Sequence, residues 1–145
     1  MNYFEELDKQ KNLLLTNIFE PEENSLQLEI SVTKLDDLKE LTINGTDFGL
    51  ATEIINDNTN IFKIVFQSYI GYSVINESYD DNGLNEIYKG KSFRIYDKSN
   101  FLNYLKSETF ATHEYPGKFS HYKIITLNHT INVASQEKPI IEKIL

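Results

Sequence analysis

The sequence contains no cysteine and no tryptophan, and its one methionine is the first residue. Without cysteine, the chain has no disulfide, no thiolate nucleophile and no cysteine-ligated zinc. Small secreted domains usually rely on disulfides, so the absence of cysteine predicts a cytoplasmic protein. The first fifteen residues carry acidic groups before basic ones and have no sustained apolar run. We therefore expect no signal peptide.

Long apolar runs and an excess of basic residues are missing too. The run Leu13-Leu14-Leu15 is far too short to cross a bilayer, so no membrane partner is expected. The formal net charge is −8. Nucleic-acid binding needs a basic surface that neutralises phosphates, so the composition argues against a nucleic-acid partner.

The charge is unevenly distributed along the chain. Residues 1–88 carry five lysines and seventeen carboxylates, a net charge of −12, whereas residues 89–145 carry nine basic and five acidic groups, a net charge of +4. One interpretation is that folding interleaves the two halves, which then neutralise each other. The other is an exposed acidic face that attracts a basic partner.

The length predicts a single domain over residues 1–145. A chain of this size buries roughly 68–70% of the surface that its unfolded form exposes. Nine phenylalanines and nine tyrosines supply large, stiff side chains for a core.

The longest alternation of apolar and polar residues covers residues 61–79. Its even positions from Phe62 to Val74 are nearly all apolar, as in a strand with one face on a core. Nineteen residues exceed the usual length of one straight strand, so a bend is expected, and Gly71 is the natural place. Because the alternation continues across Gly71, we expect one continuous strand that bends around the core.

Shorter patterns complete the predicted fold. Alternation predicts a strand over residues 26–32, and Asn44-Gly45 predicts a type I′ hairpin turn. Residues 56–60 are polar and predict a loop. Residues 3–19 are expected to be helical in part, and Ser99 is expected to cap a helix over residues 100–107. The sequence thus predicts an α+β fold, a mainly antiparallel sheet or partial barrel of about seven or eight strands.

The non-core face of the long alternation offers one candidate binding site. Glu77 shares this face with Tyr69 and Ser73, and a carboxylate beside hydroxyl groups can bind a ligand or transfer protons. Tyr72 is a further candidate from the same stretch. The alternative interpretation is a solvated strand edge.

The histidines offer a second candidate site. His121 and the pair Asn128-His129 lie in a predicted hairpin, where an imidazole and a polar cradle can form a general base. The alternative is a hairpin turn with a partly exposed histidine. No nucleophile motif, glycine-rich phosphate loop or metal-ligand spacing accompanies these residues, so we expect no catalytic residues, no metal and no cofactor.

Three runs of residues carry a resemblance to known proteins. The runs are Phe66-x-Ser68-Tyr69-Ile70-x-Tyr72-Ser73-Val74-x-Asn76-Glu77-Ser78-Tyr79, Gly90-Lys91-x-Phe93-Arg94-Ile95-Tyr96-x-Lys98-Ser99-x-Phe101-Leu102, and His121-Tyr122 with Leu127-Asn128-His129-Thr130-Ile131-Asn132-Val133. Over roughly residues 45–142, the chain resembles an uncharacterised family of small proteins from low-GC Gram-positive bacteria. The family has no assigned activity, so the resemblance implies no active site. Its type implies a partner or immunity protein of a toxin.

The sequence therefore predicts a non-enzymatic, cytoplasmic protein-binding module with a basic protein partner, of the kind that inhibits a basic toxin. The alternative is a small-ligand-binding protein or enzyme that uses a pocket of Tyr69, Tyr72, Glu77, His121 and His129. A third alternative is a homo-oligomer in which the apolar residues 140–145 pack on a neighbouring copy.

Overall fold

The computed structural model describes residues 2–35, 39–51, 54–81, 83 and 85–144. Its helices are α1 (Tyr3–Lys9) and α2 (Asn100–Glu108), and η1 (Glu77–Tyr79) is a single 3-10 turn. Its strands are β1 (Leu13–Phe19), β2 (Leu26–Leu35), β3 (Lys39–Ile43), β4 (Thr46–Ala51), β5 (Ile54–Phe66), β6 (Gly71–Asn76), β7 (Ile87–Lys89), β8 (Phe93–Lys98), β9 (Ser120–Ile125), β10 (His129–Ser135) and β11 (Ile140–Lys143).

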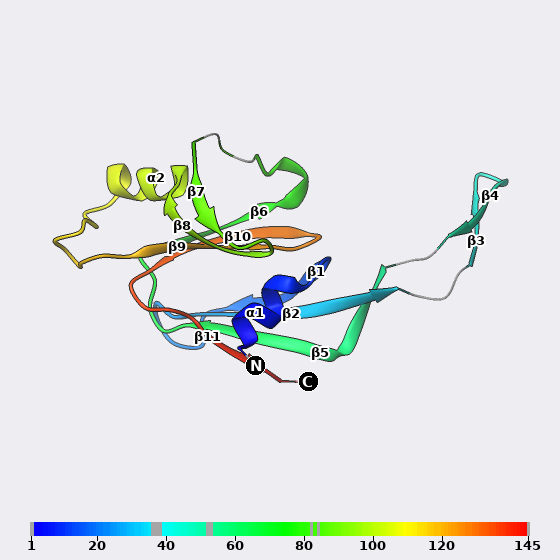
Figure 1. The fold of residues 1–145 in the computed structure, drawn as a ribbon, viewed down its shortest axis with the longest axis horizontal. Coiled ribbons are helices and arrows are strands. Elements are labelled where there is room, and N and C mark those ends of the chain that lie inside the picture. Colours follow the sequence, from blue (N-terminus) through cyan, green and yellow to red (C-terminus); the bar gives the residue numbers. More distant parts are fainter. Residues whose placement is uncertain (1, 36–38, 52–53, 82, 84, 145) are drawn as a thin grey trace.

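The described strands form three antiparallel sheets. The four-stranded sheet has the order β1-β2-β5-β11, the five-stranded sheet has the order β6-β10-β9-β8-β7, and β3 and β4 form a hairpin. The two larger sheets lie face to face, and the hairpin stands apart from them (Figure 1). The predicted α+β class with a mainly antiparallel sheet is therefore confirmed, with an open sandwich and no closed barrel.

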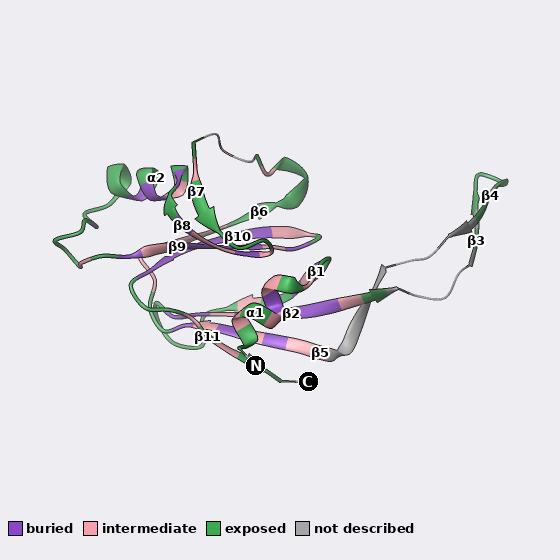
Figure 2. Ribbon diagram, in the orientation of Figure 1, coloured by how far each residue is buried: buried purple, intermediate pink, exposed green. Residues whose placement is uncertain are grey.

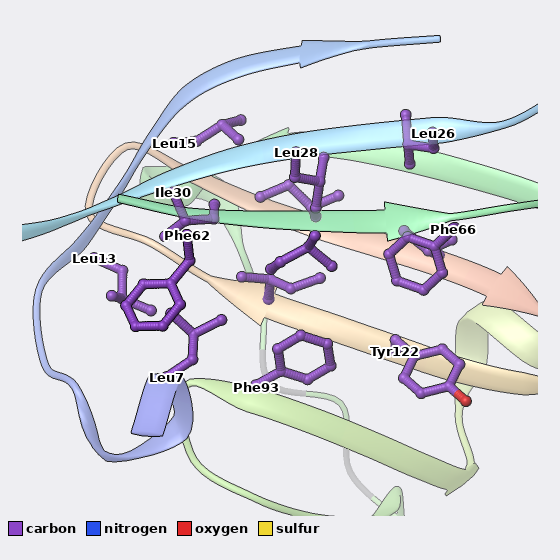
Figure 3. Packing of buried hydrophobic residues seen from close by; sticks show 14 of the residues in the cluster. Leu7, Leu13, Leu15, Leu26, Leu28, Ile30, Phe62, Phe66, Phe93 and Tyr122 are labelled. Atoms are coloured by element: carbon purple, nitrogen blue, oxygen red, sulfur yellow. The ribbon is translucent and has the colours of Figure 1, made fainter. Parts of the chain in front are cut away.

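The core fills the space between the two larger sheets. Alternate residues of β2 and β5 point inward, and they meet alternate residues of β8, β9 and β10 (Figure 3). The ring centroids of Phe66 and Tyr122, one from each sheet, lie 5.5 Å apart. The buried residues are Leu7, Leu13, Leu15, Leu26, Leu28, Ile30, Val32, Phe62, Ile64, Phe66, Phe93, Tyr122, Ile124, Ile131 and Val133.

A second, smaller cluster lies on the outer face of the five-stranded sheet, beneath α2 (Figure 2). The hydroxyl of Ser99 accepts a hydrogen bond from the backbone N–H of Leu102 and so caps the helix, as predicted. Leu102 and Leu105 then face Phe119 and Ala134. The buried side of α2 is therefore spaced by three residues, as expected for an amphipathic helix.

The N-terminal helix is shorter than the pattern over residues 3–19 indicated. It ends at Lys9, Asn12 has a φ of 59°, and Leu13–Phe19 then pairs with β2 as strand β1. Gln10, directly after the helix, already has an extended backbone (φ −72°, ψ 140°), so the helix ends there, and the left-handed Asn12 then turns the chain into β1. Leu7 still lies in the core, and α1 contacts β8 and β11 of the two sheets.

The expected continuous strand through Gly71 is wrong. Strand β5 ends at Phe66, residues 67–70 cross from one sheet to the other, and β6 begins at Gly71. The crossing contains an even number of residues, so Phe66 and Tyr72 both face the core although they belong to different sheets. This even spacing preserved the alternation and concealed the break.

Three further strands explain why the described residues form eleven strands and not seven or eight. These are β1, the separate β6, and β11, which docks the C-terminal tail on β5 of the same chain. Leu145 lies outside the described residues. The segment 56–60, expected to be a loop, lies within β5, but its pairing with β2 is interrupted: Asn56 pairs with Thr33, Ile61 pairs with Ser31, and the register shifts between these two pairs.

A pair of matched substitutions tests this assignment of faces. Ile64 is fully buried between the sheets, whereas Ile61 lies on the outer face of β5 opposite Ser31 and is half-buried. We predict that Ile64→Ala lowers the free energy of unfolding by about 2–5 kcal/mol and Ile61→Ala by about 1 kcal/mol or less. Urea denaturation measures both values, and equal losses would contradict the assignment.

Candidate functional site

The outer face of the five-stranded sheet carries a row of polar side chains. In the register of the sheet, His121 of β9 lies between Tyr96 of β8 and Ala134 of β10. Asn132 of β10 lies between Lys123 of β9 and Ser73 of β6. Because alternate residues of a strand share a face, this face collects polar groups from four strands.

His121 is the centre of a buried hydrogen-bond network. Its exposed fraction is 2%, its Nδ1 lies 2.7 Å from the Ser99 hydroxyl, and its Nε2 lies 2.7 Å from Oδ1 of Asn132. The side-chain amide of Asn132 also donates to the Ser73 hydroxyl over 3.2 Å. The carbonyl oxygen of Asn132 accepts only, so Nε2 carries the proton and Nδ1 accepts from Ser99.

Two aromatic rings pack against the imidazole. The Tyr96 ring stacks on it at 4.4 Å between centroids, and the Phe101 ring lies at 4.9 Å. Burial lowers the pKa of His121 to about 4, and the charge of Lys123 lowers it too, against the opposing hydrogen bond to Asn132. His121 is therefore neutral at physiological pH.

A cavity of about 290 Å³ lies above this network, between the N-terminus of α2 and the segment that follows η1. Two of its carboxylates are already engaged. Asp80 forms an ion pair with the buried Lys123 at 3.1 Å, and Glu86 accepts from the backbone N–H of Asn100 at 3.0 Å. Asp81, which is exposed, is the remaining charged group among the residues that line this cavity.

The serine, histidine and asparagine of this network resemble a catalytic triad in their contacts, yet they cannot act as one. The Ser99 hydroxyl is 1% exposed and caps α2, so it cannot reach a substrate. Both nitrogens of His121 are engaged. A fully satisfied buried network fixes the relative positions of strands and helix, and we assign it this structural role.

The predicted site residues do not form one pocket. His121 lines the cavity above the network, and Tyr72 lines a different cavity beside α2. Glu77 is exposed in η1, and its backbone N–H donates to the carbonyl of Asn128. His129 is half-buried, and its Nδ1 has no hydrogen-bond partner among the described residues.

Asn128 has a structural role at the opposite end of the sandwich from the cavity-lining residues of α2. Its side-chain amide accepts from the backbone N–H of Leu15 at 3.2 Å and donates to the Leu15 carbonyl at 3.1 Å. The backbone N–H of Leu127 also donates to the Leu13 carbonyl. The β9–β10 turn therefore pairs with the edge strand β1 of the other sheet and holds the two sheets together.

Tyr69 and Tyr72 lie together in and after the crossing between the sheets. Their rings meet edge to face at 4.9 Å, and the Tyr69 hydroxyl donates to Glu20 at 2.9 Å. Partial burial and this hydrogen bond raise the pKa of Tyr69, so the hydroxyl remains a donor at neutral pH. Tyr69 thereby connects the crossing to the acidic β1–β2 turn.

The β1–β2 turn is acidic and is held by its own hydrogen bonds. Glu22 and Glu23 are exposed, and the Ser25 hydroxyl accepts from the N–H of Glu22 and donates to its carbonyl. Glu20 accepts from the N–H of Asn24 as well as from Tyr69. Among the described residues, none of these three glutamates forms an ion pair.

Sequence reasoning missed most of the network around His121. Ser99 was expected only as a helix cap, and Asn132, Lys123 and Asp80 were not expected at any site. Alternation within β9 places the side chains of His121 and Lys123 on one face of that strand. The pairing register was needed to bring Asn132 beside them.

No protein-family model, no curated protein and no solved structure matches this chain. The described residues contain no group of three or more histidine, cysteine or acidic side chains placed to hold a metal ion. None of the described helices is long and apolar enough to cross a membrane. The function is therefore inferred from the chain's own residues.

The titration of His121 leads to a prediction about stability. As the pH falls, the unfolded state takes up a proton near pH 6.5 and the folded state only near pH 4. The contribution of His121 to stability is therefore complete above pH 6.5 and lost by about pH 4. We predict that the free energy of unfolding of the wild type falls by about 3 kcal/mol more than that of His121→Gln across this range.

Chemical denaturation between pH 4 and 7 measures this difference. The control is His113→Gln, because His113 is exposed and its curve should run parallel to that of the wild type. A His121→Gln curve that also runs parallel to the wild type would contradict the prediction.

Proposed function

We propose that this protein is a non-enzymatic binding module for a basic protein and that the acidic β1–β2 turn is the main contact surface. An inhibitor of a basic toxin, of the immunity type, is such a module. The observation that carries the proposal is the position of the net charge, which lies in residues 1–66, the part of the chain that builds α1, three strands of the four-stranded sheet and the β3–β4 hairpin.

The charge follows the layers of the fold. Residues 1–66 supply α1 and β1 to β5, and they carry five lysines and thirteen carboxylates, a net charge of −8. Residues 67–135 supply β6 to β10 and α2, and they carry seven groups of each sign. The remaining ten residues are also neutral, with two groups of each sign. Strand β11 is the one described strand from after residue 66 that joins β1, β2 and β5, and it adds no net charge. This arrangement supports an acidic side over mutual neutralisation.

The β1–β2 turn presents this charge in a form suited to recognition. Glu20, Glu22 and Glu23 project from a turn whose backbone is held by Ser25. An ordered turn loses little conformational entropy on binding. Unpaired carboxylates on an exposed surface attract a basic partner and accelerate association.

The outer face of the five-stranded sheet supports a binding role over a catalytic one. Its one strongly perturbed histidine is buried and hydrogen-bonded at both nitrogens. The cavity above it has its lysine and two of its three carboxylates engaged within the fold. Among the charged groups that line this cavity, these contacts leave only the exposed carboxylate of Asp81 available.

A charge-neutralised variant tests the proposal. We predict that the combined substitutions Glu20→Gln, Glu22→Gln and Glu23→Gln reduce the affinity for a basic partner, captured at low salt and purified, by about tenfold or more. The amide oxygens preserve the hydrogen bonds within the turn, so the fold is maintained. Titration calorimetry at two salt concentrations measures the loss, which should shrink at high salt.

The matched control carries Asp97→Asn, Glu114→Gln and Glu137→Gln. These three carboxylates are exposed, lie after residue 66, and change the net charge by the same amount. The control should bind within about twofold of the wild type. Equal losses in both variants, or capture of no basic protein, would reject the proposal.

A further inference from the structure

Strand β6 is an open sheet edge. It pairs with β10 on one side, and Glu77 donates its backbone N–H to the carbonyl of Asn128. In an antiparallel pair, the backbone N–H and C=O groups of alternate residues point toward the partner strand. Because the N–H of Glu77 points toward β10, the backbone groups of Tyr72 and Val74 point away from β10, out of the sheet edge. No described residue outside the ladder with β10 hydrogen-bonds to those outward groups.

This edge lacks the usual protection against pairing. Native edges carry charged residues, proline or bulges. Strand β11 contains Glu142 and Lys143, β7 is three residues long and ends at Lys89, and β1 is bulged and covered by the Asn128 side chain. Strand β6 has no charge, no proline and no register shift. Val74 on this strand is 41% exposed.

A groove of about 500 Å³ runs beside this edge, between β6 and α2. One wall is formed by residues 70–73 and the other by Phe101, Tyr104, Leu105 and Glu108 of the helix. Tyr104 is 59% exposed, so the groove has an accessible aromatic side. An open strand edge next to a groove is the arrangement that binds extended peptides by strand addition.

The charge of the groove indicates which peptide fits. Glu108 is the one charged residue among those that line it, and Glu77 follows directly at the end of β6. No lysine or arginine is among the lining residues. The backbone edge therefore selects an extended segment, the groove selects apolar side chains on one face, and the carboxylates select basic residues.

We infer that an extended, basic segment of the partner adds to β6 as a sixth strand of the five-stranded sheet and places apolar side chains in the groove beside α2. This inference rests on the proposed function, because the partner is the basic protein. It adds a second contact, made by backbone hydrogen bonds, to the electrostatic contact at the β1–β2 turn.

The first test uses a synthetic peptide as the probe. The probe is an acetylated and amidated heptapeptide that alternates lysine and isoleucine. Its binding should shift the amide NMR signals of Tyr72 and Val74 and slow their hydrogen exchange. In a bound peptide, the N–H groups of alternate residues point toward β6. N-methylation of these residues should abolish binding, whereas N-methylation of the other residues should preserve it. A peptide with glutamate in place of lysine should bind about tenfold more weakly or not at all.

The second test uses variants of the protein. Val74→Pro removes an outward N–H, and Tyr104→Ala removes part of the helix wall. Each should weaken peptide binding by about tenfold or more, which corresponds to the loss of one good contact. The control is Asn103→Ala, since Asn103 is exposed on the same helix and does not line the groove. If Val74→Pro does not fold, Tyr104→Ala alone decides the result.

Each outcome separates this inference from the proposed function. If the peptide shifts amide NMR signals only in the β1–β2 turn, and Tyr104→Ala does not change its affinity, binding in the groove is rejected and the proposed function is left intact. Binding at Tyr72 and Val74 that persists when no basic protein is captured would support the groove and reject the proposed function. A concentration-dependent dimer that Val74→Pro abolishes would show that a second copy of the chain occupies the edge, and would overturn the inference.

Discussion

The contact of Phe66 with Tyr122 joins the two sheets, and the rest of the fold is arranged around it. Their ring centroids lie 5.5 Å apart, and Phe93 and Phe4 continue the same aromatic row through the core. Aromatic pairs of this kind bury large apolar areas and set the spacing of the layers. Even-numbered residues face the core both before and after the crossing at residues 67–70. Strands β5 and β6 therefore contribute to the same core although they lie in different sheets.

This crossing also determines where the charge and the open edge lie. The acidic residues 1–66 all precede the crossing to the five-stranded sheet. Of the later described strands, only β11 returns to the four-stranded sheet. The first strand after the crossing, β6, takes an edge position in the second sheet. Tyr69 donates to Glu20 within the crossing, so the acidic turn and the open edge are linked through residues 67–70. Two surfaces proposed to bind one partner are thereby connected by a short, hydrogen-bonded segment.

Local patterns predicted much of this fold and little of the site. Strict alternation found β2, the Asn44-Gly45 turn has the positive φ values of a type I′ hairpin, and Ser99 caps α2 as expected. Strand β1 was missed because a bulge after Leu15 breaks its alternation, and the crossing was missed because it preserves alternation. The network around His121 joins residues 11, 22 and 59 positions apart, so it depends on sheet register that no local pattern contains.

The central claim is that a basic partner contacts the acidic β1–β2 turn and the β6 edge, while the His121 network serves the fold alone. Amide hydrogen exchange of the protein, measured alone and with a saturating amount of the captured partner, tests this most directly. We expect slower exchange over residues 20–25 and at the outward amides of Tyr72 and Val74, with no change around Glu86 and Asn100, which line the cavity above His121 and not the groove. Protection confined to the residues that line the cavity above His121 would contradict it.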